Sequence, residues 1–190
     1  VNDRYSQQVT VDIPEGLSGS YYLQVRTGGV YEFIYDTNNQ RGIALPITLS
    51  LSADLVVDSI TLPTTAQEGG LIDVTWTVLN QGDAATEGQW QDSVYLVPLS
   101  AGATPVLLGS YSYNQSLASG IRYTRTEQLR LPSKIEGLYR LQVITNEVSN
   151  VTNRVYEHGA AANNNSTTSN DTLTVTLNDR PDLRLTAITV

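Results

Sequence analysis

The chain has 190 residues and a net charge of −8, from 19 acidic and 11 basic side chains. This charge argues against nucleic acid and anionic membranes as partners, because proteins attract both mainly through Lys and Arg. The absence of cysteine excludes disulfides and thiolate metal sites, and no apolar run approaches the roughly 20 residues that a membrane-spanning helix needs.

Alternation of apolar and polar residues with a period of two predicts a series of short strands. In chain order, the strands of the central part are expected at residues 55–62, 71–80, 93–97, 106–113, 121–131, 139–143 and 172–177. Turn signals separate them, including Gly69-Gly70, Ser119-Gly120 and the three asparagines at 163–165. No segment has the pattern of a helix of any length, so the chain is expected to be all-β.

About seven antiparallel strands at this spacing are typical of an immunoglobulin-like β-sandwich. Trp76 lies centrally on the apolar side of its strand, where one large ring fills the space between two sheets. Tyr139 follows Gly137 at a strand start, which suggests either a tyrosine corner, whose hydroxyl bonds back to the backbone, or simply a core tyrosine. Arg125 and Glu127 interrupt the apolar positions of their strand, so we expect that part at a sheet edge or beside a bulge.

The chain also repeats itself. Residues 4–25, RYSQQVTVDIPEGLSGSYYLQV, resemble residues 122–143, RYTRTEQLRLPSKIEGLYRLQV, at an offset of 118 residues that pairs Pro14 with Pro132, Gly19 with Gly137 and Tyr21 with Tyr139. Further matches join residues 30–32 to 155–157, and 53–62 to 181–190. Repetition of this kind is the mark of a tandem array.

The matches predict three parts. Residues 53–180 form one complete unit, residues 1–52 are the C-terminal part of a preceding unit, and residues 181–190 are the first strand of a following one. A unit of this length can bury its own core, but the first part lacks its front half. Strand exchange with a neighbour would supply only one of its several missing strands. We therefore expect an excerpt from a longer protein that carries such units in tandem.

Several segments, in this order, resemble the CARDB family, the cell-adhesion-related domain found in bacteria. They are ADLVVDSITLP (53–63), VTWTVLNQGDAA (74–85), DSVYL (92–96), LPSKIEGLYRLQV (131–143) and Glu157 followed by Asn163 and Asn164. The resemblance covers residues 53–180. It implies an immunoglobulin-like sandwich that occurs in tandem in large secreted or surface proteins, with a role in adhesion or spacing and no catalysis.

Few residues are candidates for covalent or catalytic chemistry. His158, the only histidine, would have to serve any Ser–His–Asp triad, but it lies beside Gly159 in a predicted loop, and Phe33 stands at the matching position. Lys134, the only lysine, falls in a predicted exposed turn, which does not suit a buried isopeptide bond. Trp90 is a candidate for stacking on a sugar, with partial burial at a strand start as the equal alternative.

Calcium is a more serious candidate ligand, because it binds clustered oxygen atoms in loops and domain junctions. Asn178, Asp179 and Asp182 lie at the junction of the second and third parts, although the matching earlier junction keeps only Asp54. The alternative is ordinary polar turn chemistry, with Pro181 stiffening the linker.

Glutamate and asparagine recur together near the end of each unit. Glu157 with Asn163 and Asn164 is matched by Glu32 with Asn38 and Asn39. These side chains could cap a hairpin or contribute to a cation site, and capping is the preferred interpretation.

We therefore expect a non-catalytic structural or adhesive module that acts as a spacer or stalk in a long bacterial extracellular or cell-surface protein. It would need no cofactor, calcium being the one candidate, and its partners would be neighbouring repeats and other copies in a surface assembly. One alternative is a carbohydrate- or protein-binding module attached to a secreted enzyme, which an exposed aromatic platform would favour. Another is the repeat unit of an extracellular filament, which apolar contacts between copies would favour.

Overall fold

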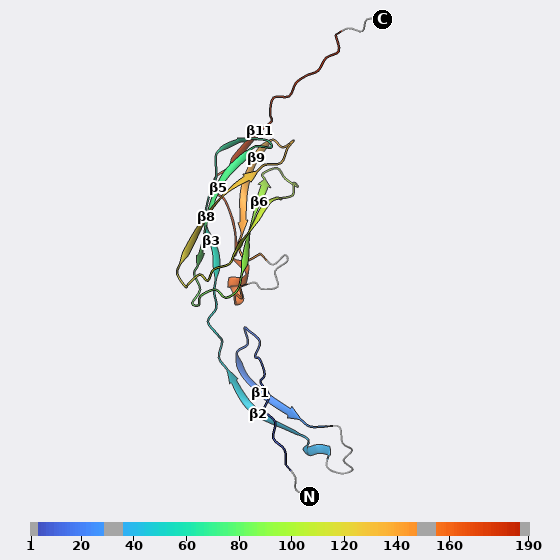
Figure 1. Cartoon of the computed structure of the whole chain (residues 1–190), viewed down its shortest axis with the longest axis vertical. Helices are drawn as coiled ribbons and strands as arrows, with labels where there is room; N and C mark the ends of the chain where they lie inside the picture. Colours follow the sequence, from blue (N-terminus) through green and yellow to red (C-terminus); the bar gives the residue numbers. More distant parts are fainter. Residues whose placement is uncertain (1–3, 29–35, 148–154, 187–190) are drawn as a thin grey trace. The chain divides into compact units, whose positions relative to one another are not determined.

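The computed structural model of the chain describes residues 4–28, 36–147 and 155–186. The chain divides into two compact units, Val1–Leu51 and Ser52–Val190 (Figure 1). Strands build both units, and the helical turns in the described residues are two short 3-10 segments, η1 (Asp36–Asn38) and η2 (Gly159–Asn163). The prediction of an all-β chain is confirmed.

The first unit is a hairpin of two antiparallel strands, β1 (Gly19–Arg26) and β2 (Gln40–Ile47). The alternating residues Tyr21, Leu23 and Val25 on β1 are 39%, 40% and 65% exposed. In the described part of this unit, no second sheet covers them. The hairpin therefore presents to solvent an apolar face of the kind that sheets normally bury.

The second unit is a two-layer sandwich of nine strands. Among the described residues, one sheet has the order β3-β5-β8, and the other has the order β4-β11-β9-β6-β7 with β10 paired to β9. The strands are β3 (Leu55–Thr61), β4 (Thr65–Gln67), β5 (Leu71–Asn80), β6 (Trp90–Pro98), β7 (Val106–Tyr113), β8 (Arg122–Arg130), β9 (Gly137–Ile144), β10 (Ser166–Thr168) and β11 (Leu173–Thr176).

Seven of the nine strands correspond to the seven expected, whereas β4 and β10 lie outside the expected ranges and were not predicted. After β3, the Leu62-Pro63 step takes the chain to the opposite sheet, where β4 pairs in parallel with β11. Proline supplies no N–H to a ladder, so it suits such a crossing point. The last strand is interrupted between β10 and β11 at Ser169, whose Oγ accepts the N–H of Leu141 at 3.1 Å. The side chain of Ser169 thus continues the pairing with β9 across the break.

The core lies between the two sheets and follows the predicted alternation. Trp76 is fully buried at its centre, together with Val74 and Val78 from the same strand. On the facing sheet, Leu141 and Val143 of β9 are also fully buried. Each such side chain contributes roughly 1.5–3 kcal/mol relative to exposure.

Strand β8 lies at a sheet edge, since within the described residues it pairs with β5 alone. This confirms the expectation drawn from Arg125 and Glu127. The Arg125 Nε atom lies 2.7 Å from Glu127 Oε1, and its guanidinium packs 4.8 Å from the centre of the Tyr111 ring. The guanidinium also donates to the carbonyl of Ser112 on β7 at 3.0 Å, so Arg125 bridges the two sheets at their open side.

The two turns that match in sequence have similar φ angles. Gly19 and Gly137 have φ angles of 119° and 115°, and Gly16 and Lys134, also 118 residues apart, have φ angles of 76° and 62°. Lys134 is thus a non-glycine residue held in the left-handed region. Residues 181–186 adopt no strand, and residues 187–190 of the expected third part lie outside the described chain.

Candidate functional site

The points where the polypeptide enters and leaves the sandwich carry its densest polar contacts. At the entry, Asn80 is fully buried at the end of β5. Its Oδ1 accepts the N–H groups of Asp54 and Gly82, both at 3.1 Å. Its Nδ2 donates to the carbonyls of Ala84 and Leu117, at 2.8 and 2.9 Å. All four hydrogen-bonding positions of the Asn80 amide, two donors and two acceptors, are therefore used. The amide holds the strand that enters at Asp54 against the loop that follows β5.

Close packing of two backbones reinforces this entry. The carbonyl of Ser52 accepts N–H groups from Asp83 and Ala84, at 3.1 and 3.2 Å. A Cβ atom at Gly82 would lie 2.5 Å from both Ser52 O and Asp54 N. Glycine is therefore required here because the two chain segments are in direct contact.

Glu157 holds the same end of the sandwich from the other side. Its Oε1 accepts the N–H of Leu55 at 2.5 Å, and its Oε2 accepts the side-chain amides of Asn146 and Asn165, both at 2.6 Å. Burial raises the pKa of Glu157, and these donors oppose the increase. Asn164 instead bonds to Asp54 at 3.0 Å. Glu157 therefore ties the entering strand to this end of the sandwich and does not cap a hairpin with Asn163 and Asn164, as the sequence had suggested.

The exit is organised around Glu68, which follows β4 and is 4% exposed. Its Oε1 lies 2.7 Å from Arg180 Nη2, and its Oε2 accepts the N–H of Lys134. The backbone carbonyl of Glu68 also accepts Asn178 Nδ2 at 3.0 Å. The hydrogen bond from Arg180 is the main reason why the pKa of Glu68 is lowered. Glu68 therefore binds the departing chain at residues 178 and 180.

Of the three calcium candidates, Asn178 belongs to this exit and Asp179 and Asp182 are exposed beside it. Within the described residues, no group of three or more His, Asp or Glu side chains is arranged to hold a metal ion. The nearby carboxylate of Glu68 is paired with Arg180. Calcium binding through these three residues stays a prediction.

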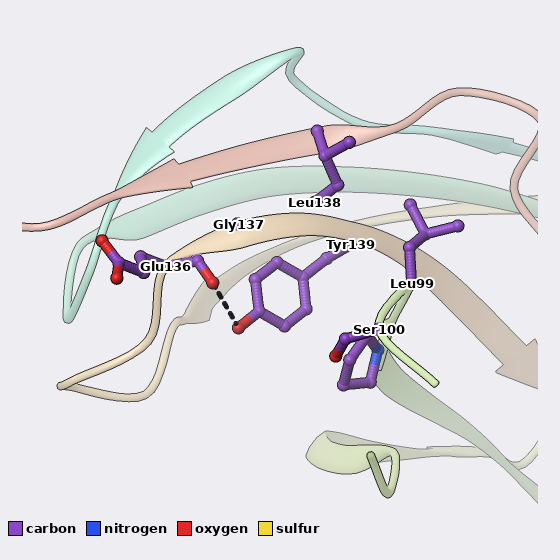
Figure 2. A pocket seen from close by; sticks show the side chains of 7 residues that line it. Leu99, Ser100, Glu136, Gly137, Leu138 and Tyr139 are labelled. Atoms are coloured by element: carbon purple, nitrogen blue, oxygen red, sulfur yellow. Dashed lines mark hydrogen bonds between the residues drawn. The ribbon is translucent and has the colours of Figure 1, made fainter. Parts of the chain in front are cut away.

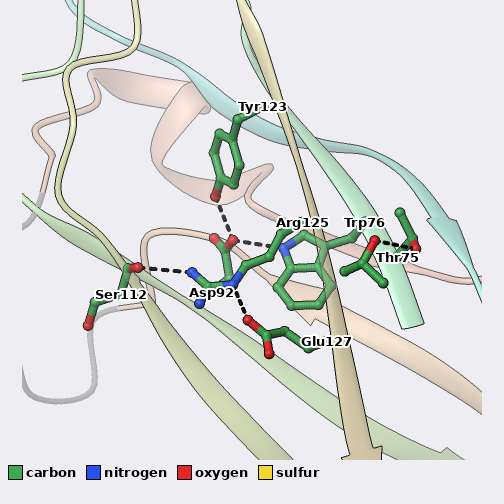
Figure 3. Close-up of polar contacts among 8 residues, drawn as sticks. Thr75, Trp76, Asp92, Ser112, Tyr123, Arg125 and Glu127 are labelled. Atoms are coloured by element: carbon green, nitrogen blue, oxygen red, sulfur yellow. Dashed lines mark hydrogen bonds and ion pairs between the residues drawn. The ribbon is translucent and has the colours of Figure 1, made fainter. Parts of the chain in front are cut away.

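A buried carboxylate lies inside the sandwich, at Asp92 on β6. Its Oδ2 accepts Trp76 Nε1 at 2.7 Å and the Tyr123 hydroxyl at 2.5 Å (Figure 3). The fully buried hydroxyl of Thr145 lies beside this carboxylate and helps to lower its pKa. Burial raises the pKa of Asp92, and the bonds from Tyr123 and Trp76 only partly oppose it.

Tyr139 closes the exit end of the core. Its hydroxyl donates to the carbonyl of Glu136 at 3.3 Å, the upstream contact that a tyrosine corner makes (Figure 2). Its ring lines a pocket of about 290 Å³, with Leu99 and Leu138 at the same site. This volume is at the lower limit of ligand pockets, roughly 300–1,000 Å³. Ser100 and Glu136 also line this pocket.

The remaining candidates from the sequence are dispersed. His158 is exposed and lies 3.0 Å from the Tyr156 hydroxyl through its Nδ1 atom. Lys134 is exposed in a turn, as expected. Trp90 is only 1% exposed and its Nε1 donates to Tyr123 at 3.3 Å. The suggestion that Trp90 stacks on a sugar is therefore wrong, because the core encloses its ring.

Sequence reasoning did not identify Glu68, Asn80 or Asp92. Asp92 had a usable signal, since it shares the parity of Trp90, Val94 and Leu96 on one strand. Glu68 had none, because its partner Arg180 is distant in the sequence. Neither Glu68 nor Asp92 has a catalytic partner in the described chain. Each of the two holds neighbouring segments together.

Comparison with known proteins agrees with this architecture. Residues 52–169 match the family model CARDB, whereas no curated protein matches the sequence. The crystal structure of a CARDB domain from Pyrococcus furiosus, in complex with di-metal ions, is 22% identical, with 66% of this chain and 90% of that chain covered and a TM-score of 0.45. A solution structure of the same domain is 23% identical, with 65% and 95% covered and a TM-score of 0.43.

A β-glucosidase from Listeria innocua is also similar, at 22% identity and a TM-score of 0.36, over 57% of this chain and 16% of that chain. The similarity is to a small part of the enzyme and says nothing of its activity. CARDB domains are adhesion-related β-domains, usually non-catalytic and typical of surface proteins. Because the match at 52–169 spans more than half of the sequence, the chain belongs to the CARDB family.

Proposed function

We propose that the chain is a non-catalytic structural repeat module, a spacer or stalk in a long bacterial surface or extracellular protein. One observation carries this proposal: the polypeptide enters and leaves the sandwich at opposite ends of β5. Leu55 at the entry pairs with Asn80, the last residue of β5. Glu68 at the exit lies just before Leu71, its first residue. Ten residues of strand separate the ends by about 33 Å.

This arrangement places the sandwich under shear when its ends are pulled apart. The chain of β3 and β4 runs from the entry toward the exit, and β11 runs parallel to β4 toward the same exit. Tension would draw these strands along their axes in opposite directions. Several ladder hydrogen bonds must then break together, which supports a role in transmitting force or holding distance.

The proposal includes the tandem organisation. Residues 1–52 would be the C-terminal part of a preceding repeat and residues 181–190 the first strand of a following one, with neighbouring repeats as partners. The matched φ angles at Gly19 and Gly137 support this assignment. So does the exposed apolar face of β1, since the residues matching Tyr21, Leu23 and Val25 are the buried Tyr139, Leu141 and Val143. Family membership supports an extracellular or surface location.

Single-molecule force spectroscopy on the whole chain tests the spacer role. We expect one cooperative unfolding peak whose contour-length gain is about 40 nm, from the sandwich residues at about 3.5 Å each. Glu68→Gln should lower the peak force by weakening the exit, whereas Glu136→Gln, exposed in the turn that holds Lys134, should not. Extension without a peak would contradict the proposal. Saturable binding to a soluble polysaccharide would instead favour the carbohydrate-binding alternative.

A further inference from the structure

The charged residues are distributed very unevenly along the sandwich. Residues 93–121 contain no acidic, basic or histidine side chain, in a chain in which 16% of the residues are charged. Strand β7 (Val106–Tyr113) lies in the middle of this segment. The other edge strand on the same open side, β8, carries Arg122, Arg125, Glu127 and Arg130. One edge is therefore charged and the other is neutral.

Strand β7 is open on one side. Within the described residues it pairs with β6 alone. The carbonyl of Ser112 points away from β6, since it accepts the Arg125 guanidinium of the opposite sheet. Residues two apart in an antiparallel strand direct their backbone groups alike, so the N–H and carbonyl of Ser110 also face outward. Val106 and Leu107 on this strand are 41% and 51% exposed.

Sheet edges of monomeric proteins usually carry a device that prevents pairing, most often a charged side chain. On β8 that device is present. On β7, a register shift at Leu108 interrupts the ladder, and it leaves the stretch from Gly109 to Tyr113 regular. This stretch has neither charge nor proline. Since Arg125 already engages the carbonyl of Ser112, the part of this edge that is open for pairing is Gly109 to Tyr111.

We propose that β7 pairs antiparallel with β7 of a second copy of this chain, about a two-fold axis close to Ser110. Charge favours a second copy as the occupant. Each copy carries a net charge of −8, and a two-fold contact at β7 brings together residues 93–121 of the two copies, the one long segment without charges. The reciprocal bonds would join the N–H and carbonyl of Ser110 in the two copies, and Gly109 of one would lie opposite Tyr111 of the other. A two-fold contact closes on itself and yields a dimer. This lateral association goes beyond the spacer role and does not depend on it.

Crosslinking tests the register directly, because the chain has no cysteine. In an antiparallel hydrogen-bonded pair the Cα atoms lie about 5.5 Å apart, within disulfide range. Ser110→Cys should therefore give a disulfide-linked dimer under mild oxidation. Gln128→Cys, exposed on the charged edge β8, should remain monomeric under the same conditions. Equal crosslinking of the two variants would overturn the proposal.

Sedimentation equilibrium of the whole chain gives the second measurement. The wild type should dimerise, and Ser110→Lys and Ser110→Pro should each raise the dissociation constant by at least about tenfold. Proline removes an outward N–H that β6 does not use, so it spares the existing ladder. Gln128→Lys adds the same charge elsewhere and should leave the dimer intact. A monomeric wild type, or dimers that survive both Ser110 substitutions, would overturn the proposal.

Discussion

Asp92 illustrates how one residue fixes the interior of the sandwich. Its carboxylate joins Trp76 of one sheet to β6 of the other, and Tyr123 links it further to Trp90. A buried carboxylate is costly when charged, and the hydrogen bonds to Asp92 offset only part of that cost. Its neighbours on the packed elements are Trp76, Tyr123, Arg125 and Thr145, and the guanidinium of Arg125 is shared with Glu127 and Ser112.

The raised pKa of Asp92 predicts a specific dependence of stability on pH. Since the folded-state pKa lies above the ordinary value of 3.8, the native state holds this proton more tightly than the unfolded chain does. Its contribution is therefore fully present below the unfolded pKa and is lost as pH rises through the folded pKa. Asp92→Asn resembles the protonated acid, so its unfolding free energy should increase relative to wild type as pH rises over this window.

Urea unfolding followed by tryptophan fluorescence checks this prediction, because Trp76 and Trp90 both lie in the sandwich. The exposed Asp171→Asn provides the control, since it removes the same charge outside the core. A difference between Asp92→Asn and wild type that stays constant with pH would show that Asp92 is not preferentially protonated in the native state.

Part of this interior could be predicted from the sequence alone. The burial of Trp76 follows from its parity in a strand of alternating residues. Asp92 has the same kind of parity, but the predicted strand begins only at residue 93 and does not include it. Local periodicity also cannot show that Trp90 and Tyr123 meet across the two sheets, because their contact depends on tertiary packing.

At the scale of elements, β1 and β9 form a natural comparison. They share the sequence pattern around Tyr21 and Tyr139 and begin with glycines of the same conformation. Yet Leu23 on β1 is 40% exposed, whereas Leu141 on β9 is fully buried. Two strands of one pattern thus differ in energy because only one of them has a facing sheet.

This comparison predicts different costs for one substitution at two matched sites. Leu141→Ala should lower the free energy of unfolding of the sandwich by about 2–5 kcal/mol, since it leaves a cavity between the sheets. Leu23→Ala should leave the unfolding of the sandwich unchanged and cost far less in the hairpin. Chemical denaturation of both variants measures the difference, and similar losses for the two would mean that the face of β1 is covered.

The sequence predicted the positions of most strands, because alternation and turn residues are local signals. It did not predict that the first strand changes sheets at Pro63, or that the last is divided at Ser169. In both places the partner strand decides the outcome: β4 exists through its pairing with β11, and β10 and β11 through theirs with β9. Pairing over long sequence separations has no local pattern.

For the whole molecule, the repeat predicts that parts of the two units are interchangeable. A hybrid in which residues 53–131 are joined directly to residues 14–52 should fold as a sandwich, with β1 and β2 in place of β9 to β11. Its unfolding should be cooperative, and Leu23→Ala should then cost about 2–5 kcal/mol, as in a packed core. The same residues 53–131 joined to a reversed 14–52 sequence provide the control. A hybrid without a cooperative transition would contradict the assignment of residues 1–52 as the back of a repeat.

The central claim is that the polypeptide enters and leaves the sandwich at opposite ends. The absence of cysteine allows a spin label at each end, through Asp83→Cys beside the entry and Asp179→Cys beside the exit. Pulsed electron spin resonance should give a single narrow distance distribution centred at about 30 Å or more, the length of β5. A distribution centred below about 15 Å, or one too broad for a fixed separation, would contradict a spacer built on this fold.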